Sequence, residues 1–282
     1  MDGKSLAEKK LQSLADKISK MPCKPQLDII LIGDDFASVV YVNLKKKKAE
    51  SVGIKCQIHA FPQNSSENEV LEKVNFLNKN PETSGILVQL PLPEYFDKIK
   101  ILNSVQTSKD VDGLNSENIG LLFQNSPNFV PATPLGILQL LDFYKIDLIG
   151  KHVCIVGASL IIGIPLFGIL KNLGATISVC DSQTKDLKFF TQNADIIISA
   201  TGVANLIDKS FVKENSVLID VGTNKNPKYP LEKNKICGDF DFESFKNFNC
   251  QITPVPGGVG PMTISALLEN VVKSAENIKS FV

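Results

Sequence analysis

The 282-residue sequence contains no arginine and no tryptophan, and histidine occurs only at His59 and His152. Without arginine, a bound anion must be held by lysine, backbone N–H groups or hydroxyls. Both histidines fall in or at the start of expected strands, so we interpret them as packing residues. We therefore expect neither a histidine-based triad nor a zinc site, and we predict no metal.

Charge of one sign is not in excess either, because 30 basic residues balance 30 acidic ones. The chain has no basic stripe or tail of the kind that binds nucleic acid or a membrane surface. No apolar run approaches the roughly 20 residues that span a bilayer, and the N-terminus MDGKSLAEKK lacks an apolar signal core. We expect no nucleic-acid or membrane partner.

Closely spaced cysteine pairs are also absent, since none of the six cysteines forms a CxxC motif. Several lie in strand-like apolar runs such as HVCIV and TISVC. We interpret all six as buried, reduced thiols of a cytoplasmic protein. They are Cys23, Cys56, Cys154, Cys180, Cys237 and Cys250.

Alternating strand and helix patterns are plentiful, and hydrophobic residues make up 43% of the chain. Strand-like QLDIILIG, IKCQIHAF and SGILVQL alternate with two helical patterns, which is a βαβαβ arrangement. A second alternation begins at KHVCIVG and has expected helices at 163–172 and 184–191, and a terminal helix is expected at 262–279. The sequence predicts two α/β domains with parallel sheets.

We place the domains at residues 1–130, completed by 255–282, and at 131–254. The terminal helix is expected to return to the first domain, because the second alternation is complete by about residue 250.

A glycine-containing turn follows the strand HVCIV, with Gly157, Ser159 and Gly163 in GASLIIGIP. It is not a GxGxxG motif, but it lies between a strand and a helix at the start of a βαβ unit. Backbone N–H groups can face a pyrophosphate at such a turn. A dinucleotide site and a purely structural turn both remain open from this pattern alone.

The next strand ends at Asp181, 24 residues after Gly157. A carboxylate there can bind the ribose 2′-hydroxyl of NAD and would repel the 2′-phosphate of NADP. It could equally cap the following helix. Ser182, Thr184 and Lys185 could still receive a phosphate.

Three further motifs contain unusual residues. KDVDG carries Asp110 and Asp112, but it lacks the ligand and glycine spacing of a calcium loop, so turn formation is the simpler interpretation. VQLPLP places Gln89 at the carboxyl end of a strand, where ligands of parallel sheets bind. TPVPGGVGPMT (253–263) is a narrow proline- and glycine-rich loop that we expect to contact a ligand.

Taken together, these motifs resemble the bifunctional methylenetetrahydrofolate dehydrogenase/methenyltetrahydrofolate cyclohydrolase family. The matching segments run in family order across essentially the whole chain. They are YVNLK (41–45), VQLPLP (88–93), KDVDG (109–113), PATP (131–134), GASLIIGIP (157–165), IDVGTN (219–224), GDF (238–240) and TPVPGGVGPMT.

The resemblance implies a folate-binding catalytic domain, a Rossmann-like NAD(P)-binding domain, a folate cleft between them, and a homodimer. It also implies the oxidation of 5,10-methylenetetrahydrofolate and the hydrolysis of the product to 10-formyltetrahydrofolate, in the one-carbon metabolism that serves purine and amino-acid biosynthesis.

The resemblance assigns catalytic roles to four residues. Lys45 would be the catalytic lysine, oriented by Gln89, while Tyr41 would stack on the folate and Asp112 would hold the pterin. The other implied folate contacts are Val88, Leu90, Pro256, Gly257, Gly258, Val259 and Gly260. The implied cofactor contacts are Gly157, Ala158, Ser159, Gly163, Asp181, Ser182 and Thr223.

The chain departs from the family at two places near the cofactor. Thr223 replaces a common isoleucine, and no arginine is present to hold a 2′-phosphate. NADP is the commoner family cofactor and is our expectation, with NAD possible because of Asp181. A monofunctional dehydrogenase, a different two-domain dehydrogenase and a non-catalytic folate-binding protein are the alternatives.

Helical geometry distinguishes Lys45 from the three lysines that follow it in YVNLKKKKAE. At about 100° per residue, Lys45 shares an arc with Ser38, Val42 and Ala49, a small and apolar face. Tyr41 is its i−4 neighbour. Burial disfavours the charged form of a lysine, which suits proton transfer.

Overall fold

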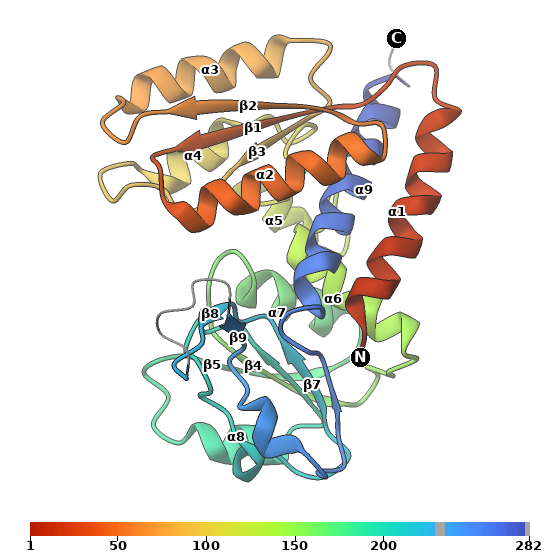
Figure 1. Cartoon of the computed structure of the whole chain (residues 1–282), viewed down its shortest axis with the longest axis vertical. Coiled ribbons are helices and arrows are strands. Elements are labelled where there is room, and N and C mark those ends of the chain that lie inside the picture. Colours follow the sequence, from red (N-terminus) through yellow and green to blue (C-terminus); the bar gives the residue numbers. More distant parts are fainter. Residues whose placement is uncertain (229–234, 280–282) are drawn as a thin grey trace. The chain divides into compact units, whose positions relative to one another are not determined.

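The computed structural model describes residues 1–228 and 235–279, which form two compact units (Figure 1). The three-strand unit comprises Glu8–Ala132 and the chain from Ile264 onward. The five-strand unit comprises Met1–Ala7 and Thr133–Thr263.

The three-strand unit is built on a parallel sheet of order β2-β1-β3. In the central strand, Ile29 pairs with Ile58 on one side and with Leu87 on the other. Its elements are α1 (Gly3–Ser19, which begins in the other unit), β1 (Gln26–Ile32), α2 (Phe36–Ser51), β2 (Lys55–Phe61), α3 (Glu67–Lys79), β3 (Gly85–Val88), α4 (Lys98–Ser104), α5 (Ser116–Phe123) and most of α9 (Val259–Lys279).

Helices cover both faces of this sheet, with α2 and α3 on opposite sides (Figure 1). Alternate residues of β1, such as Leu27 and Ile29, pack with Val42 and Ala49 of α2 in one apolar core that also includes α9. Burial on both faces explains why residues 29–32 of β1 are all apolar. The alternation of the sequence therefore predicted the layers correctly.

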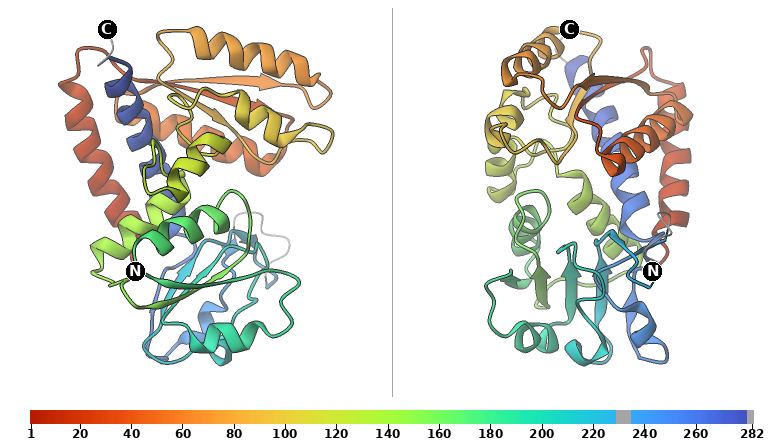
Figure 2. Two further views of the ribbon diagram at one scale, coloured as in Figure 1. Left: turned by 180° about the vertical axis from the view of Figure 1, so that it is seen from behind. Right: turned by 60° about the vertical axis from the view of Figure 1, so that its left-hand side comes forward.

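The C-terminal helix α9 lies beside α1, as both ribbon views show (Figure 2). Ion pairs join the two helices, with Lys10 Nζ 3.0 Å from Glu269 and Lys17 Nζ 2.8 Å from Glu276. The predicted return of this helix to the first α/β unit is confirmed.

The five-strand unit has a parallel sheet of order β10-β7-β6-β4-β5 and a small antiparallel ribbon, β8-β9. This sheet separates two apolar cores, one on each of its faces, and helices cover both. The elements are α6 (Ala132–Phe143), β4 (His152–Val156), α7 (Gly163–Asn172), β5 (Thr176–Cys180), α8 (Leu187–Asn193), β6 (Ile196–Ser199), η1 (Lys209–Phe211), β7 (Val217–Asp220), β8 (Asn224–Lys225), β9 (Ile236–Cys237), η2 (Phe242–Phe245) and β10 (Gln251–Ile252).

Several boundaries differ from the sequence-based expectation. Helix α8 begins three residues later, because the Asp186 side chain accepts from the Phe189 N–H and caps it there. Helix α9 begins three residues earlier and includes Pro261 in its first turn, where a missing N–H costs nothing. The short helices α4 and α5 and the two-residue strand β10 were not predicted.

The two histidines make structural contacts, as expected. His59 Nε2 lies 2.7 Å from Asp28 Oδ1, and His152 Nε2 lies 2.8 Å from Ser178 Oγ. The expectation of six buried cysteines is wrong in part. Cys23 is exposed because it lies in the bend between α1 and β1, and two others are half-buried, namely Cys237 and Cys250.

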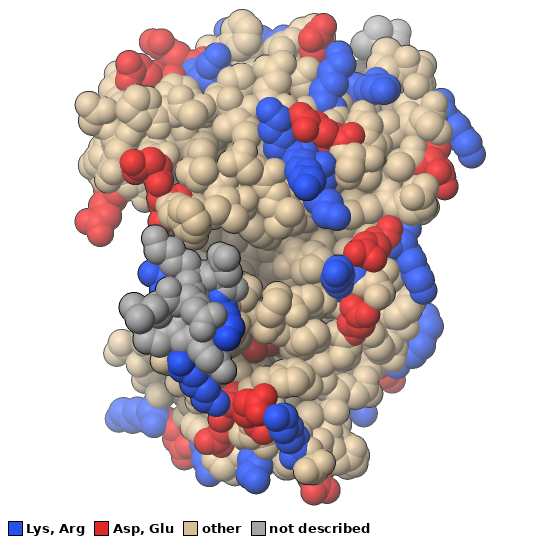
Figure 3. Space-filling view, in the orientation of Figure 1, with Lys and Arg blue, Asp and Glu red and all other residues tan. Residues whose placement is uncertain are grey.

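Basic and acidic side chains are interspersed on the molecular face drawn in Figure 3. Within residues 1–228 and 235–279, no helix is both long and apolar enough to cross a bilayer.

A buried carboxylate in β1 binds polar side chains from β1, from β2 and from the segment before β3. Asp28 is fully buried and accepts hydrogen bonds from Gln26, His59 and Thr83. Burial alone would raise the pKa of Asp28, but these hydrogen bonds outweigh it and lower the pKa below the usual 3.8. The charged form of this group therefore stabilises the fold.

We expect Asp28→Asn to destabilise the protein by about 1–3 kcal/mol at neutral pH, because the replacement leaves buried donors unsatisfied. A carboxyl whose pKa is lowered on folding contributes stability above its unfolded pKa and loses it in acid. The difference from wild type in urea unfolding should therefore shrink as the pH falls below 3.8. The exposed Asp34→Asn is the control, and a pH-independent difference would contradict this account.

Candidate active site

The Lys45 side chain is nearly inaccessible, with 6% of the residue exposed. It lies on the face of α2 formed by Ser38, Val42 and Ala49, as helical spacing predicted. Lys47 is exposed, whereas its two neighbours in the run are half-buried. Of the four lysines, only Lys45 belongs to the buried face of α2.

The Lys45 amine meets two of the residues that were predicted to accompany it. Its Nζ donates to Gln89 Oε1 at 2.9 Å and lies 4.7 Å from the centre of the Tyr41 ring. The Gln89 amide donates in turn to the Leu90 carbonyl at 2.6 Å, which fixes the orientation of its oxygen toward the lysine. Gln89 directly follows β3, so the amide lies at the carboxyl end of the sheet.

Asp112 belongs to the same electrostatic group. Burial lowers the pKa of Lys45, and the nearby Asp112 carboxylate opposes this effect by favouring the ammonium. Burial likewise raises the pKa of Asp112, and Lys45 opposes that shift. Each group thus reduces the pKa shift that burial causes in the other, so the pKa of the Lys45 amine depends on the Asp112 carboxylate.

Tyr41 remains a neutral phenol in this setting. Burial, and then the Asp112 charge, raise the pKa of Tyr41 to about 12. The ring can therefore offer an uncharged face and an O–H donor beside Lys45.

The rest of the KDVDG segment holds Asp112 in place. Asp110 forms a parallel bridge with Ile86 of β3 and accepts from the N–H of Asn115 and the amide of Asn118, both at 2.8 Å. Lys109 donates to three carbonyls at the end of α3. The interpretation of Asp110 as a turn former agrees with these bonds, although its burial also raises its pKa to about 6.

Two other predicted folate contacts flank Gln89. Val88 is buried at the end of β3, and Leu90 is half-buried. Tyr41, Lys45, Gln89 and Asp112 are thus brought together in the three-strand unit, although they come from three segments of the chain.

The glycine turn after β4 requires glycine for two reasons. Gly157 has φ +114°, a conformation that side chains rarely adopt, and a Cβ there would lie 2.5 Å from the Ala200 carbonyl oxygen. A Cβ at Gly163 would lie 1.9 Å from the Gly157 carbonyl oxygen. Ala158 is half-buried and Ser159 is exposed, so the turn closes tightly on itself while Ser159 faces outward from it.

Asp181 is exposed at the carboxyl end of β5, next to this turn. Its carboxylate accepts from the Gln183 N–H at 2.9 Å, and its own N–H donates to Thr184 Oγ1. It does not cap α8, because Asp186 does so. The alternative of a helix cap is therefore wrong, and the carboxylate is presented at the sheet edge beside the exposed Ser182.

The loop before α9 belongs to the five-strand unit. Gly257 has φ +109°, and its carbonyl accepts the N–H of Lys4 at 2.8 Å. A Cβ at Gly258 would lie 2.6 Å from the Pro254 carbonyl oxygen. Pro256 and Gly260 are exposed, whereas Val259 is buried in the core.

Two buried carboxylates near the glycine turn were not predicted. Asp220 ends β7, and Asp239 follows β9. Burial raises the pKa of Asp220 to about 6, against hydrogen bonds from Asp239, Phe240 and Gly222. Both lie in motifs that the sequence shares with the family, IDVGTN and GDF. The motifs themselves do not indicate that the two segments are in contact.

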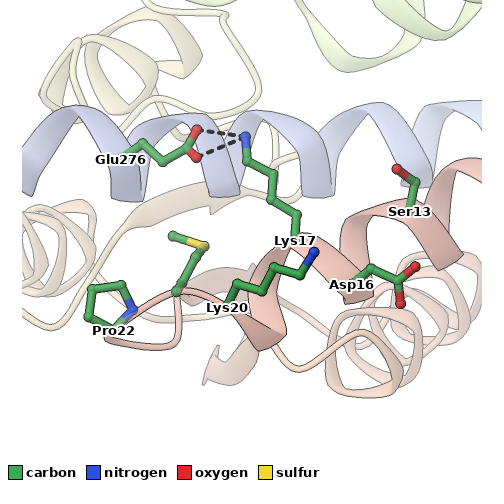
Figure 4. Close-up of a pocket in the computed structure, with 7 residues that line it drawn as sticks. Ser13, Asp16, Lys17, Lys20, Pro22 and Glu276 are labelled. Carbon is green, nitrogen blue, oxygen red and sulfur yellow. Dashed lines mark hydrogen bonds and ion pairs between the residues drawn. The ribbon is translucent and has the colours of Figure 1, made fainter.

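A charged surface groove of about 650 Å³ lies in the three-strand unit, between the end of α1 and α9 (Figure 4). Lys17 and Glu276 form an ion pair in it, and none of the predicted site residues lines it. Among the described residues, no cluster of three or more His, Cys, Asp or Glu side chains could hold a metal.

One parallel sheet covered by a helix with a buried lysine, and a second parallel sheet with a dinucleotide-type turn, are the features of a two-domain α/β oxidoreductase. Residues 1–112 match the catalytic domain of the tetrahydrofolate dehydrogenase/cyclohydrolase family, and residues 131–279 match its NAD(P)-binding domain. The chain belongs to this family.

The similarity to individual relatives extends over the whole chain. The bifunctional protein FolD of Campylobacter jejuni (strain RM1221) is 48% identical over 281 residues, with 98% of both chains covered. The FolD protein of Nautilia profundicola is 45% identical over 280 residues, which is 98% of this chain and 97% of that protein.

Two solved structures of enzymes from this family are similar to the chain over nearly its whole length. The bifunctional FolD enzyme of Campylobacter jejuni has a TM-score of 0.92 and 47% identity, with 98% of each chain covered. The Trypanosoma brucei enzyme, solved with NADP and an inhibitor, has a TM-score of 0.93 and 31% identity over 98% of this chain and 97% of that chain.

Proposed function

We propose that this protein oxidises 5,10-methylenetetrahydrofolate with a nicotinamide dinucleotide and then hydrolyses the methenyl product to 10-formyltetrahydrofolate. Membership of the family supports the reaction class. The observation that carries the hydrolytic half is the buried Lys45 amine, held by Gln89 and opposed by the Asp112 charge.

Oxidation moves a hydride from the one-carbon bridge of the folate to the nicotinamide. The bridging nitrogens supply electrons to the carbon, so this step requires no protein base. The protein's contribution is to hold two flat rings in a reactive geometry. We assign the dinucleotide to Gly157, Ala158, Ser159, Gly163 and Thr223.

Hydrolysis of the methenyl cation does require proton transfer. Water loses a proton as its oxygen bonds to the carbon, and the departing ring nitrogen gains one as the ring opens. A neutral Lys45 amine accepts the first proton, and burial favours that neutral form. Gln89 keeps the amine in one position throughout.

The remaining folate contacts are proposals of the same kind. Tyr41 stacks on the folate as a neutral ring, and the Asp112 carboxylate accepts hydrogen bonds from N–H groups of the pterin. Val88 and Leu90 supply the wall beside Gln89. Further contacts come from Pro256, Gly257 and Gly258 in the loop before α9, and from Val259 and Gly260 in the first turn of this helix.

The buried lysine also bears on the alternatives. A monofunctional dehydrogenase or a non-catalytic folate-binding protein has no use for a desolvated amine with a lowered pKa.

The family commonly uses NADP, and we propose it as cofactor, but the exposed Asp181 carboxylate favours NAD. A homodimer, a cytoplasmic location and a role in supplying purine and amino-acid biosynthesis complete the proposal.

The experiment that tests the function is an assay of purified protein with methylenetetrahydrofolate and a dinucleotide, in which methenyl and 10-formyl products are followed separately. We expect both activities in the wild type. Lys45→Ala should reduce hydrolysis by roughly 10²-fold or more, as expected for loss of an acid/base group, and should reduce hydride transfer much less.

Lys47→Ala is the matched control, because Lys47 is exposed on the same helix. It should leave both activities unchanged. Equal losses of both activities in a folded Lys45→Ala variant would mean that Lys45 chiefly positions the folate.

The pH dependence of hydrolysis tests the coupling between Lys45 and Asp112. If the neutral amine is the base, the rate rises with pH through the pKa of Lys45. Asp112→Asn removes a charge that raises this pKa, so the rising limb of kcat should move to lower pH. A profile measured at saturating substrate that does not move would separate Asp112 from the proton transfer.

Asp181→Ser tests the choice of cofactor. Removing the carboxylate eliminates its repulsion of a 2′-phosphate, so the ratio of kcat/KM for NADP to that for NAD should increase. The KM for folate serves as an internal control and should stay constant. An unchanged cofactor ratio would remove Asp181 from the selectivity.

A further inference from the structure

Asp239 is a fully buried carboxylate of the five-strand unit that the proposed chemistry does not use. Its Oδ2 accepts three hydrogen bonds, from Ser199 Oγ at 2.8 Å, Thr201 Oγ1 at 2.9 Å and the Thr201 backbone N–H at 2.7 Å. Its Oδ1 accepts a fourth, from Asn224 Nδ2 at 2.9 Å. A carboxylate can accept all four bonds because both of its oxygens are acceptors. An asparagine amide at this position would have only one acceptor oxygen.

These four donors come from the exits of two neighbouring strands. Ser199 ends β6 and Thr201 lies in the loop after it, whereas Asn224 lies in the segment after β7. Strands β6 and β7 pair in parallel, so both exits lie at the carboxyl edge of the sheet. One buried group therefore ties together two loops at the edge where parallel sheets bind their ligands.

The first of these loops forms one side of the glycine turn. The Ala200 carbonyl oxygen lies 2.5 Å from the position that a Cβ of Gly157 would occupy. The Ala200 N–H also donates to the Val156 carbonyl at 2.8 Å, directly before the turn. A displacement of the Ala200–Thr201 segment would therefore displace the backbone that faces the dinucleotide.

The second loop carries a predicted cofactor contact. Thr223 lies between Asn224, which is bound to Asp239, and Gly222, where a Cβ would lie 2.0 Å from Asp239 Oδ1. Asp220 completes the frame by accepting the N–H groups of Gly222 and Asp239 at 3.0 and 2.9 Å. Close contact on both sides of Thr223 makes its position dependent on the Asp239 carboxylate.

We propose that Asp239 is a positioning residue for the dinucleotide. Its carboxylate fixes the loops after β6 and β7 in their positions relative to the glycine turn. The proposal rests on the proposed binding of NAD or NADP to this unit. It assigns Asp239 no contact with the reacting atoms.

Asp239→Asn is the direct test. If the amide oxygen keeps the Ser199 and Thr201 donors, the new NH₂ group faces the Asn224 NH₂ group, and two donors then oppose each other. We expect the Kd for NADPH or NADH, measured by fluorescence titration without folate, to rise roughly tenfold. The KM for methenyltetrahydrofolate in a dinucleotide-free hydrolysis assay should remain within twofold of wild type.

A second replacement should reverse the defect. In Asp239→Asn/Asn224→Asp, the amide at 239 can donate to the carboxylate at 224, which restores one donor and one acceptor between the loops. The Kd should return most of the way to the wild-type value. Asn224→Asp alone places two carboxylates together and should weaken dinucleotide binding.

Asp195→Asn is the matched control at the other end of the same strand. Asp195 precedes β6 and accepts from the His152 N–H at 2.9 Å and from Lys213 Nζ at 2.7 Å. Its replacement should lower thermal stability without changing the Kd for the dinucleotide. If Asp239→Asn fails to fold, Thr201→Val removes one of the same bonds and should still raise the Kd.

The outcomes separate the two proposals. A wild-type protein that binds neither NADPH nor NADH would overturn the proposed function. Wild-type affinity in folded Asp239→Asn, or an equal rise in the folate KM, would overturn the positioning role alone. A double variant that binds no better than Asp239→Asn would also contradict it.

Discussion

The parallel alignment of the strands within each sheet is the constraint on which both candidate sites depend. Parallel strands bring all their carboxyl ends to one edge, where the following segments must turn and expose backbone groups. Gln89 follows β3, the glycine turn follows β4, and Asp181 follows β5. Strand direction thus places Gln89 at the carboxyl edge of the three-strand sheet, and the glycine turn and Asp181 at the carboxyl edge of the five-strand sheet.

Within the three-strand unit, the proposed proton transfer by Lys45 depends on a balance between desolvation and charge. Removing water from Lys45 favours the neutral amine, whereas the Asp112 carboxylate favours the ammonium. Neither effect alone would suit the role proposed for Lys45, which is to accept and release a proton. Gln89 adds a neutral acceptor, which fixes the position of the amine without adding a further charge.

In the five-strand unit, buried carboxylates fix the loops at the carboxyl edge of the sheet. Asp220 and Asp239 accept backbone and side-chain donors from loops that regular secondary structure leaves unsatisfied. The nearby glycines have a steric reason, since a Cβ at Gly238 would lie 1.8 Å from Asp220 Oδ2. Polar burial and small residues are therefore parts of one arrangement at this edge.

Predictions from the sequence succeeded where a local pattern carries the physics. Helical spacing identified the buried face of α2 and separated Lys45 from Lys47, and strand alternation predicted both sheets. They were less accurate at element ends, because side-chain caps decide those. Asp186 rather than Asp181 begins α8, and both are aspartates in the same short segment.

Periodicity and motif order were sufficient to predict the two α/β units, the family and the lysine on a small, apolar helix face. The folded structure was needed to see that Gln89 accepts from Lys45, that Asp112 opposes the effect of burial on the pKa of Lys45, and that a single carboxylate joins the exits of β6 and β7. Such contacts join segments far apart in the chain. Their distances and burial arise when the strands pair and the helices pack, and no local pattern encodes them.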